Sequence, residues 1–421
     1  MIYESAALPT ELRRPVIDSK CAGKRRKERG FRPYNPQVAI SPFKPSVPEV
    51  QLADLRERLA RTRFPDEIVG SGWTYGFDSE YLHSLRDYWL NRFDWRQQEQ
   101  QWGRLPHFQA ETQGLKIHFI HVRGAGKRPL PIIITHGWPG SFLEILKLIP
   151  MLANPEPFGG DPNDAFDVIV PSLPGFGFSD RPSTPGWNTF KTAEVWAELM
   201  QQLGYEKFVA QGGDFGANVS TVLAWKYPER VMAFHLNYIP GSYLPFVDAS
   251  SPANEEEKAF LASAERWIDQ KGAYWHVQRN EPQTLAAALN DSPVGLAAWL
   301  IDKYRDWADC DGDVERRFTK DELLAHVSLY WLTETIGSSM RLYVESSKAP
   351  LHFTKGERVQ VPCGVARFPK EDPMPPRCWA ERVYNIRRWT EMPRGGHFAA
   401  WEEPELLARE LREFFRPFRP L

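Results

Sequence analysis

The segment 207–217, KFVAQGGDFGA, holds the residues whose types and spacing most directly indicate chemistry. It predicts a short strand, a glycine-flanked turn and a helix that begins near Gly216. This order is typical of a nucleophile elbow, G-x-Nuc-x-G, in which a strained turn lifts a nucleophilic side chain above a sheet. Asp214 stands in the nucleophile position of that pattern, where a hydrolytic elbow commonly carries serine.

An aspartate in this position changes the reaction that the turn can perform. A serine alkylated by an epoxide or a haloalkane would become an ether, which water does not easily cleave. A carboxylate alkylated in the same way becomes an ester, and water can attack its acyl carbon to restore the side chain. Asp214 therefore favours alkylating substrates over esters and amides. The alternative is an inactive hydrolase that has lost its serine, and the other residues of a hydrolytic site argue against it.

His397 is the candidate base of such a site. It lies in a glycine-rich loop, RGGHF at 394–398, just before a terminal helix that we expect to begin near Glu402. An α/β-hydrolase places its histidine in a loop of this kind, last in the order nucleophile, acid, histidine. The position of His397 in the chain and the flanking glycines both fit that order.

The acid that orients this histidine is expected late in the chain. Residues 364–368 predict a strand, and Glu371 and Asp372 stand side by side in the loop after it. The other usual place for the acid is the loop 237–241, which contains no carboxylate. The late pair is therefore favoured, and spacing alone does not choose between its two members.

Backbone N–H groups are needed to stabilise the negative charge that develops when water attacks the ester. Phe215, directly after the nucleophile, is expected to supply one. Trp138, in the segment HGWPGS at 136–141 that follows a predicted buried strand, is expected to supply the other. We expect His136 to shape this loop and not to act as a second base.

The elements that must position these residues predict an α/β fold. Alternating strands and helices indicate a mostly parallel central sheet with flanking helices. Strands are predicted at 115–122, 130–135 and 167–171, and helices at 142–151 and 192–203. The core is expected to comprise residues 110–240 and 350–421. The stretch 241–349 between them is helical in pattern and rich in aromatic residues, which predicts a lid over the carboxyl edge of the sheet.

The N-terminal part shows no catalytic pattern. Residues 1–30 are expected to be a disordered tail, and 31–109 an extension that braces the core. Within this extension we expect one helix capped by Ser46 and a second capped by Asp78 or Ser79.

Composition excludes several classes of function. The 421 residues include 52 Lys and Arg against 54 Asp and Glu, which gives a formal net charge of −2 and no case for nucleic-acid binding. The four cysteines lack metal-ligand spacing and suggest reduced thiols in a cytoplasmic protein. No apolar run is long enough for a membrane anchor, so we expect a soluble protein.

Several long segments, taken in order, resemble one known family. They are HGWPGS (136–141), PSLPGFGFSD (171–180), GGDFGANVS (212–220), NDSPVGLAAW (290–299), HVSLYWLTET (326–335) and RGGHFAAWEEP (394–404). Together they resemble the epoxide hydrolases of the α/β-hydrolase superfamily, in the microsomal-type branch with an additional N-terminal domain. The resemblance covers the chain from about Phe31 onward.

This resemblance implies a reaction and further site residues. It implies that Glu371 is the acid, and that Tyr274 and Tyr343 are the lid tyrosines that donate to the epoxide oxygen. A lipophilic epoxide and water would give a vicinal diol through an ester on Asp214, without cofactor or metal, and the enzyme could be a homodimer. The alternatives are a haloalkane dehalogenase that uses the same aspartate, and a catalytically silent binding protein with this fold.

Overall fold

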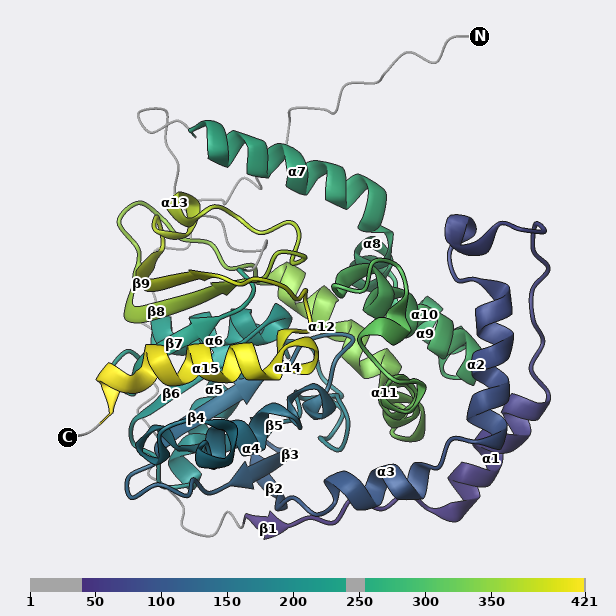
Figure 1. Ribbon diagram of the computed structural model, residues 1–421, viewed down its shortest axis with the longest axis horizontal. Helices are drawn as coiled ribbons and strands as arrows, with labels where there is room; N and C mark the ends of the chain where they lie inside the picture. Colours follow the sequence, from purple (N-terminus) through teal and green to yellow (C-terminus); the bar gives the residue numbers. More distant parts are fainter. Residues whose placement is uncertain (1–39, 240–253, 420–421) are drawn as a thin grey trace, which may run out of the picture. The chain divides into compact units, whose positions relative to one another are not determined.

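The computed structural model describes residues 40–239 and 254–419 (Figure 1). These residues belong to one compact unit that begins at Val38. The expected disordered tail at 1–30 lies outside the described residues.

Nine strands of the described residues form one sheet, in the order β1-β2-β3-β5-β4-β6-β7-β8-β9. The sheet is antiparallel from β1 to β5 and parallel from β5 to β9, which confirms the expected α/β-hydrolase architecture. The strands are β1 Ser41–Pro42, β2 His107–Thr112, β3 Leu115–Val122, β4 Leu130–Thr135, β5 Phe166–Pro171, β6 Phe208–Gly212, β7 Val231–Leu236, β8 Val359–Arg367 and β9 Tyr384–Glu391.

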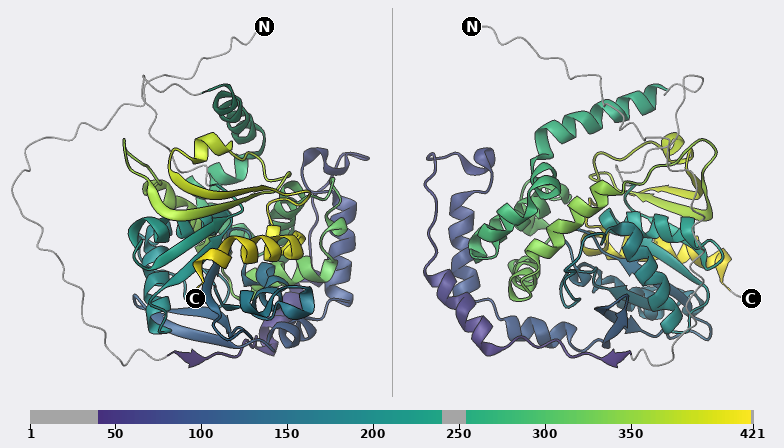
Figure 2. Two further views of the ribbon diagram at one scale, coloured as in Figure 1. Left: turned by 60° about the vertical axis from the view of Figure 1, so that its left-hand side comes forward. Right: turned by 180° about the vertical axis from the view of Figure 1, so that it is seen from behind.

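Helices cover both faces of this sheet. Helices α5 (Thr189–Gln202) and α6 (Asp214–Lys226) pack against each other, and α4 (Leu148–Ala153) packs against α15 (Pro404–Phe415). Figure 1 shows α15 crossing in front of the sheet, and the view from behind in Figure 2 brings the teal α6 forward. Strands β4 and β6 are therefore buried between layers, which explains why their sequences are almost wholly apolar.

Element boundaries follow the sequence closely, with one break. Strands β3 and β4 coincide with the predicted ranges. The helix predicted at 142–151 was wrong, because it divides into a 3-10 helix, η2 (Phe142–Ile145), and the short α4. Pro150 has no N–H to donate to the carbonyl of Leu146, so a continuous α-helix would lose that hydrogen bond.

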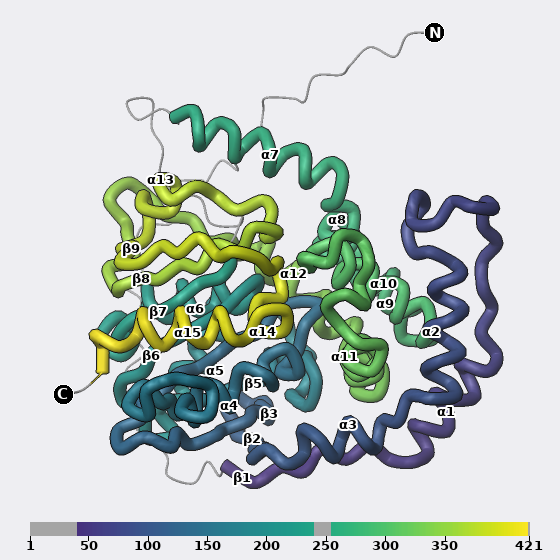
Figure 3. The backbone as a smooth tube through the Cα atoms, in the orientation of Figure 1, coloured from purple at the N-terminus to yellow at the C-terminus, as the bar shows by residue number. Residues whose placement is uncertain are grey.

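The N-terminal extension contributes both helices and strands. Its helices are α1 (Glu49–Ala60), α2 (Ser79–Asn91) and α3 (Trp95–Trp102), with a 3-10 helix η1 at Gly72–Tyr75. Strand β2 crosses the expected boundary at 109, so the extension also continues the sheet. Figure 3 shows the chain passing from β1 through these helices alongside the lid.

The helix caps were predicted with mixed success. Asp78 caps α2 by accepting a hydrogen bond from the N–H of Tyr81 at 2.7 Å. The cap predicted at Ser46 was wrong, since α1 begins at Glu49 and Pro48 precedes it. Proline fixes its own φ angle near the helical value, so the chain can enter a helix directly after it.

The described part of the segment expected as a lid is helical throughout. It comprises α7 (Glu255–Lys271), α8 (Ala273–Asn280), α9 (Pro282–Leu289), α10 (Pro293–Trp307), η5 (Val314–Arg316), α11 (Lys320–Leu332) and α12 (Ile336–Lys348). Helices α8 and α12 pack together, and α10 and α11 contact the N-terminal helices α1, α2 and α3. The chain then returns to the sheet through β8, α13 (Arg377–Ala380) and β9, and ends with α14 (Ala399–Glu402), α15 and η6 (Arg416–Phe418). None of the helices in the described ranges is long and apolar enough to span a bilayer.

A buried indole joins the N-terminal layer to the lid. Trp89 on α2 is 3% exposed, and its Nε1 donates to the hydroxyl of Ser328 on α11 at 3.1 Å. The pair joins residues that are 239 positions apart in the chain. It therefore ties the bracing extension to the helices that cover the sheet.

Replacing this indole should destabilise the whole unit. Trp89→Ala should cost about 3–5 kcal/mol of unfolding free energy, because it removes a large buried aromatic group. Ser328→Ala, which removes only the acceptor, should cost about 1 kcal/mol. Urea unfolding followed by circular dichroism measures both. Equal, small losses for the two variants would show that the extension is not bound through this contact.

Candidate active site

Asp214 is the first residue of α6 and has a left-handed backbone conformation, with φ at 47°. This conformation is costly for a residue with a side chain, and such strain typically marks functional positions. It is maintained by close backbone approach, since a Cβ at Gly216 would collide with the carbonyl of Thr135 at the end of β4. The turn therefore presents the Asp214 carboxylate at the carboxyl edge of the sheet, where ligands bind in open α/β folds.

Both expected oxyanion donors contact this carboxylate. The N–H of Trp138 donates to Asp214 Oδ1 at 2.9 Å, and the N–H of Phe215 is also hydrogen-bonded to the carboxylate. Burial raises the pKa of Asp214 above its ordinary value, and the charge of His397 and these two N–H groups counteract that rise. The donors therefore help to keep a largely buried nucleophile ionised.

Glu371 contacts the ring of His397 through its carboxylate. His397 Nδ1 lies 2.8 Å from Glu371 Oε2 and 3.1 Å from Oε1, and the Glu371 side chain is 4% exposed. Asp372, the other candidate from sequence, is exposed. On the opposite side of the ring, His397 Nε2 lies 3.6 Å from Asp214 Oδ2. The nucleophile, the imidazole and Glu371 thus form one line of interacting groups.

The charge state of the histidine follows from these neighbours. Burial alone would lower the pKa of His397, but the charge and hydrogen bond of Glu371 and the charge of Asp214 outweigh it and raise the pKa to about 9. At neutral pH the imidazole is therefore protonated and lies between two carboxylates. Any process that removes the charge of Asp214 also lowers the pKa of His397.

Glu402 holds the loop that carries the histidine. Its carboxylate accepts hydrogen bonds from the N–H groups of Gly396 at 3.1 Å, Phe398 at 2.9 Å and Asp309 at 2.7 Å. The N–H of His397 itself donates to the carbonyl of Trp307 at 3.0 Å. Sequence reasoning missed this role of Glu402, because the pattern marked the residue only as the start of a helix.

The two lid tyrosines lie above the elbow. Tyr274 on α8 stacks on Trp138 at 5.7 Å between ring centroids, and Tyr343 on α12 lies edge-on to Phe215 at 4.8 Å. Their hydroxyls are hydrogen-bonded to each other, and their pKa values are both raised well above 10 by burial, with Asp214 contributing to each rise. Both phenols therefore stay protonated and able to donate near the carboxylate.

Two further tyrosines, from the stretch that the sequence marked only as rich in aromatic residues, hold the loop of Trp138. Tyr304 on α10 donates to the carbonyl of Pro139, and Tyr330 on α11 donates to the carbonyl of Gly140, each at 2.8 Å. His136 hydrogen-bonds to the carbonyl of Gly137 at 2.9 Å and accepts from the N–H of Leu173 at 3.2 Å. The expected loop-shaping role of His136 agrees with these contacts.

Two cavities lie in the described residues, one beside Asp214 and His397 and one away from the expected catalytic residues. A small one of about 30 Å³ adjoins the triad. It is lined by Thr135, His136, Gly137, Trp138, Glu144, Ile145, Gln211, Gly213, Asp214, Asn237, His397, Phe398, Ala399 and Ala400.

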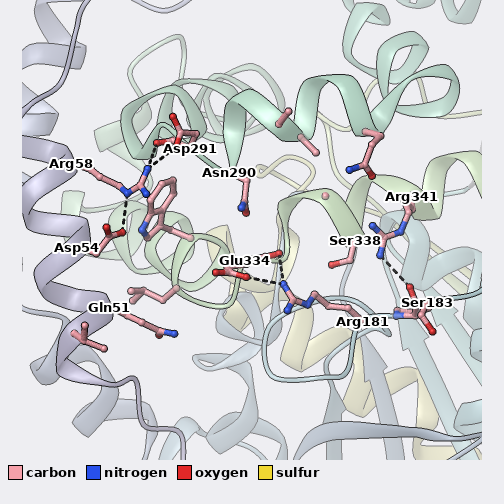
Figure 4. A pocket seen from close by; sticks show the side chains of 18 residues that line it. Gln51, Asp54, Arg58, Arg181, Ser183, Asn290, Asp291, Glu334, Ser338 and Arg341 are labelled. Carbon is pink, nitrogen blue, oxygen red and sulfur yellow. Dashed lines mark hydrogen bonds and ion pairs between the residues drawn. The ribbon is translucent and has the colours of Figure 1, made fainter.

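The larger cavity, of about 830 Å³, lies between α1, the lid helices α9, α11 and α12, and the loop at 181–183 (Figure 4). Ion pairs border it, with Arg58 bound to Asp54 and Asp291, and Arg181 bound to Glu334. None of the expected catalytic residues lines it. In residues 40–239 and 254–419 no cluster of three or more His, Cys, Asp or Glu side chains could bind a metal ion.

Comparisons with known proteins agree with this geometry. A family model described as the epoxide hydrolase N terminus matches residues 40–145, and one described as the alpha/beta hydrolase fold matches residues 131–296. The chain is 38% identical over 407 residues to epoxide hydrolase 1 of Oryctolagus cuniculus, covering 89% of this chain and 88% of the relative.

Two solved structures are also similar over most of their length. The juvenile hormone epoxide hydrolase of Bombyx mori superimposes with a TM-score of 0.77 at 31% identity, covering 91% of this chain and 94% of that one. The Aspergillus niger epoxide hydrolase gives a TM-score of 0.78 at 30% identity, covering 90% and 97%. With such identities over most of each chain, the protein belongs to the epoxide hydrolase family of the α/β-hydrolases.

Proposed function

We propose that the enzyme converts a lipophilic epoxide and water to a vicinal diol through a covalent ester on Asp214. The observation that carries this proposal is the environment of the Asp214 carboxylate. Backbone donors and a protonated imidazole favour its ionised form against the effect of burial, and two protonated phenols lie on its lid side. A nucleophile and an acid for the leaving oxygen are thus available at one place.

In the first half-reaction an Asp214 oxygen attacks an epoxide carbon and the C–O bond of the ring breaks. The ring oxygen becomes an alkoxide, which Tyr274 and Tyr343 stabilise by donating hydrogen bonds and then a proton. The product of this step is an ester between Asp214 and the opened alcohol. Desolvation strengthens these hydrogen bonds relative to water, which favours ring opening inside the closed site.

In the second half-reaction water attacks the carbonyl carbon of the ester. The N–H groups of Trp138 and Phe215 stabilise the resulting oxyanion. Ester formation has removed the negative charge of Asp214, so the pKa of His397 falls below the value of about 9 in the free enzyme. His397 can then lose its proton and act as the base that takes a proton from water. Collapse of the oxyanion releases the diol as His397 passes its proton to the departing oxygen. The other proton of the attacking water leaves the Asp214 carboxyl and restores the phenol that protonated the alkoxide, so the carboxylate and both tyrosines return to their starting states.

The substrate class follows from the aromatic wall of the site. Five aromatic rings form this wall, and the centroids of neighbouring rings are 4.8–6.3 Å apart. They belong to Trp138, Phe215, Tyr274, Trp307 and Tyr343, and they provide apolar surface but little charge. Such a wall favours a lipophilic epoxide. The Bombyx mori relative, a juvenile hormone epoxide hydrolase, is consistent with this class.

One observation bears on the dehalogenase alternative. Trp138 Nε1 is buried and has no hydrogen-bond partner in the described residues, so it could donate to a halide. The position after the nucleophile is Phe215, which has no side-chain donor, whereas the paired phenols suit an oxygen leaving group. We therefore favour the epoxide, and chloride release from haloalkanes without epoxide turnover would favour the alternative.

The ester should be trapped by removing the base. His397→Gln should leave alkylation intact and slow ester hydrolysis by about 10²–10⁴-fold, because general base catalysis is lost. Intact mass spectrometry after exposure to a styrene-type epoxide should then find an adduct that peptide mapping assigns to Asp214. An adduct on another residue, or none with several reactive epoxides, would contradict the proposal.

Substitutions at three carboxylates of the site and its neighbourhood serve as controls for this experiment. Glu371→Gln should also allow the adduct to accumulate, because the imidazole loses its orienting charge. Asp372→Asn changes the exposed neighbour in the same way and should turn over like the unmodified enzyme. Asp214→Asn should give no adduct on residue 214.

The two half-reactions should differ in pH dependence. Alkylation needs ionised Asp214, so its rate constant should fall as pH decreases through the raised pKa of that carboxyl. Ester hydrolysis needs neutral His397, so its rate constant should rise with pH, with a midpoint below the pKa of about 9 in the free enzyme. Single-turnover rapid-quench experiments separate the two constants. Hydrolysis that is independent of pH, or that has its midpoint above 9, would contradict the role of His397.

A further inference from the structure

Glu144 is a carboxyl beside the triad that neither half-reaction uses. It lies on η2, directly after the loop 136–141 that carries Trp138. Burial raises the pKa of Glu144 to about 8, and the charge of Asp214 contributes to this rise. The charge of His397 and a hydrogen bond from the backbone N–H of Ser141 act in the opposite direction. Near neutral pH this side chain is therefore mostly a neutral carboxylic acid within electrostatic reach of both catalytic groups.

The carboxyl lines the small cavity that also reaches Asp214 and His397. Its volume of about 30 Å³ exceeds the roughly 10–15 Å³ that a cavity needs to hold one water molecule. Polar side chains line it as a bound water requires, since Glu144, His397, Asp214 and Asn237 are all present. His397 Nε2 lies 3.6 Å from Asp214 Oδ2, which is longer than a hydrogen bond, so Nε2 has no direct hydrogen bond to this carboxylate and can bond to a water beside the pair.

This cavity is built entirely by the core. Its lining residues come from the loops after β4, β6 and β7, from η2, and from the histidine loop with α14. No residue of the described lid helices contributes, although Tyr274 and Tyr343 lie on the other side of Trp138 and Phe215. A water in this place would approach Asp214 from the core side, away from the leaving oxygen held by the phenols.

The Glu144 carboxyl occupies the space that a side chain at Gly140 would fill. A Cβ added at Gly140 would overlap Glu144 Oε1, so any larger residue there would displace the carboxyl. The backbone at Gly140 is fixed by the hydroxyl of Tyr330 on its carbonyl. Gly140 thus provides the space into which Glu144 extends.

We propose that Glu144 binds the water that hydrolyses the alkyl-enzyme ester; this inference rests on the proposed function of Asp214. One O–H of the water donates to His397 Nε2, and the other donates to the carbonyl oxygen of the neutral Glu144 carboxyl. The water oxygen attacks the carbonyl carbon of the ester, and its first proton passes to His397. That proton then passes to the departing alkoxide of the diol, so Glu144 orients the water and exchanges no proton.

Three variants test this role. Glu144→Leu keeps the volume but removes the acceptor, and should lower the hydrolysis rate constant by about 10- to 100-fold, as expected for the loss of one hydrogen bond to a reacting water. Glu144→Gln keeps a carbonyl acceptor and should stay within about 3-fold of the unmodified enzyme. Gly140→Ala should displace the Glu144 carboxyl and slow hydrolysis in the same direction as Glu144→Leu.

Rapid-quench mass spectrometry of the full-length enzyme with a styrene-type epoxide measures both rate constants and the alkylated fraction. In Glu144→Leu the alkylation constant should be unchanged, and the ester on Asp214 should accumulate. Combining Gly140→Ala with Glu144→Leu should add no further loss, because both changes remove the same contact.

Several results would overturn the inference. Equal slowing of alkylation and hydrolysis would indicate a merely structural role, as would a fall in thermal midpoint that accounts for the lost activity. Hydrolysis unchanged in Glu144→Leu, or slowed as much by Glu144→Gln, would show that no water is bound through the carbonyl oxygen. Failure of the proposed function is distinguishable, because no variant, His397→Gln included, would then form an ester on Asp214.

Discussion

The site depends on keeping a negative charge on Asp214 in a place that disfavours it. Burial raises the pKa of this carboxyl, and two backbone N–H groups and a protonated imidazole oppose that rise. The backbone pays a cost as well, because Asp214 is held in a left-handed conformation at the start of α6. The N–H groups of Trp138 and Phe215 bond to the carboxylate, and in the proposed mechanism the same groups then stabilise the oxyanion.

The same charge connects the two half-reactions. While Asp214 is ionised, it helps to keep His397 protonated, and the imidazolium in turn stabilises the nucleophile. In the proposed mechanism, alkylation neutralises Asp214 and thereby lowers the pKa of His397, so the base becomes available only when there is an ester to hydrolyse. Glu371 remains throughout to orient the ring. The proposed order of the two steps thus follows from the electrostatic coupling of Asp214 and His397.

The lid and the core form one catalytic unit. Helices α8 and α12 carry the phenols that face the substrate side, whereas α10 and α11 supply Tyr304 and Tyr330 to the carbonyls of the Trp138 loop. Two lid helices thus bind the loop that carries the backbone N–H of Trp138. The N-terminal layer supports this arrangement by packing against α10 and α11.

Local patterns predicted the parts of the fold and site that depend on local geometry. The glycines around Asp214 and the apolar run of β4 suffice to place the elbow above a buried parallel sheet. Tertiary contacts were not predictable in this way. Glu371 and Asp372 are adjacent in the sequence, and only the resemblance chose the one that is buried against the imidazole. Tyr304 was one of many lid aromatics, and nothing in its spacing marked it as a donor to the core.

Two other features were hidden for physical reasons. Strands β1 and β2 belong to the sheet because β1 pairs with residues distant in sequence and β2 forms a hairpin with β3. The sequence predicted two helices in the extension and no strand there. In the sequence, Glu144 is one polar residue within the segment 142–151 that was predicted as a helix. Its carboxyl lines the same cavity as His397 and extends into the space left by Gly140, which the local pattern does not reveal.

The central claim is that the protein itself is transiently alkylated, and oxygen isotopes test it most directly. A single turnover in water enriched in ¹⁸O should leave the label in the side chain of Asp214, because water attacks the acyl carbon. The first diol released should carry no label, because its new oxygen comes from the aspartate. Label found directly in that diol, with the Asp214 carboxyl still unlabelled, would contradict the account.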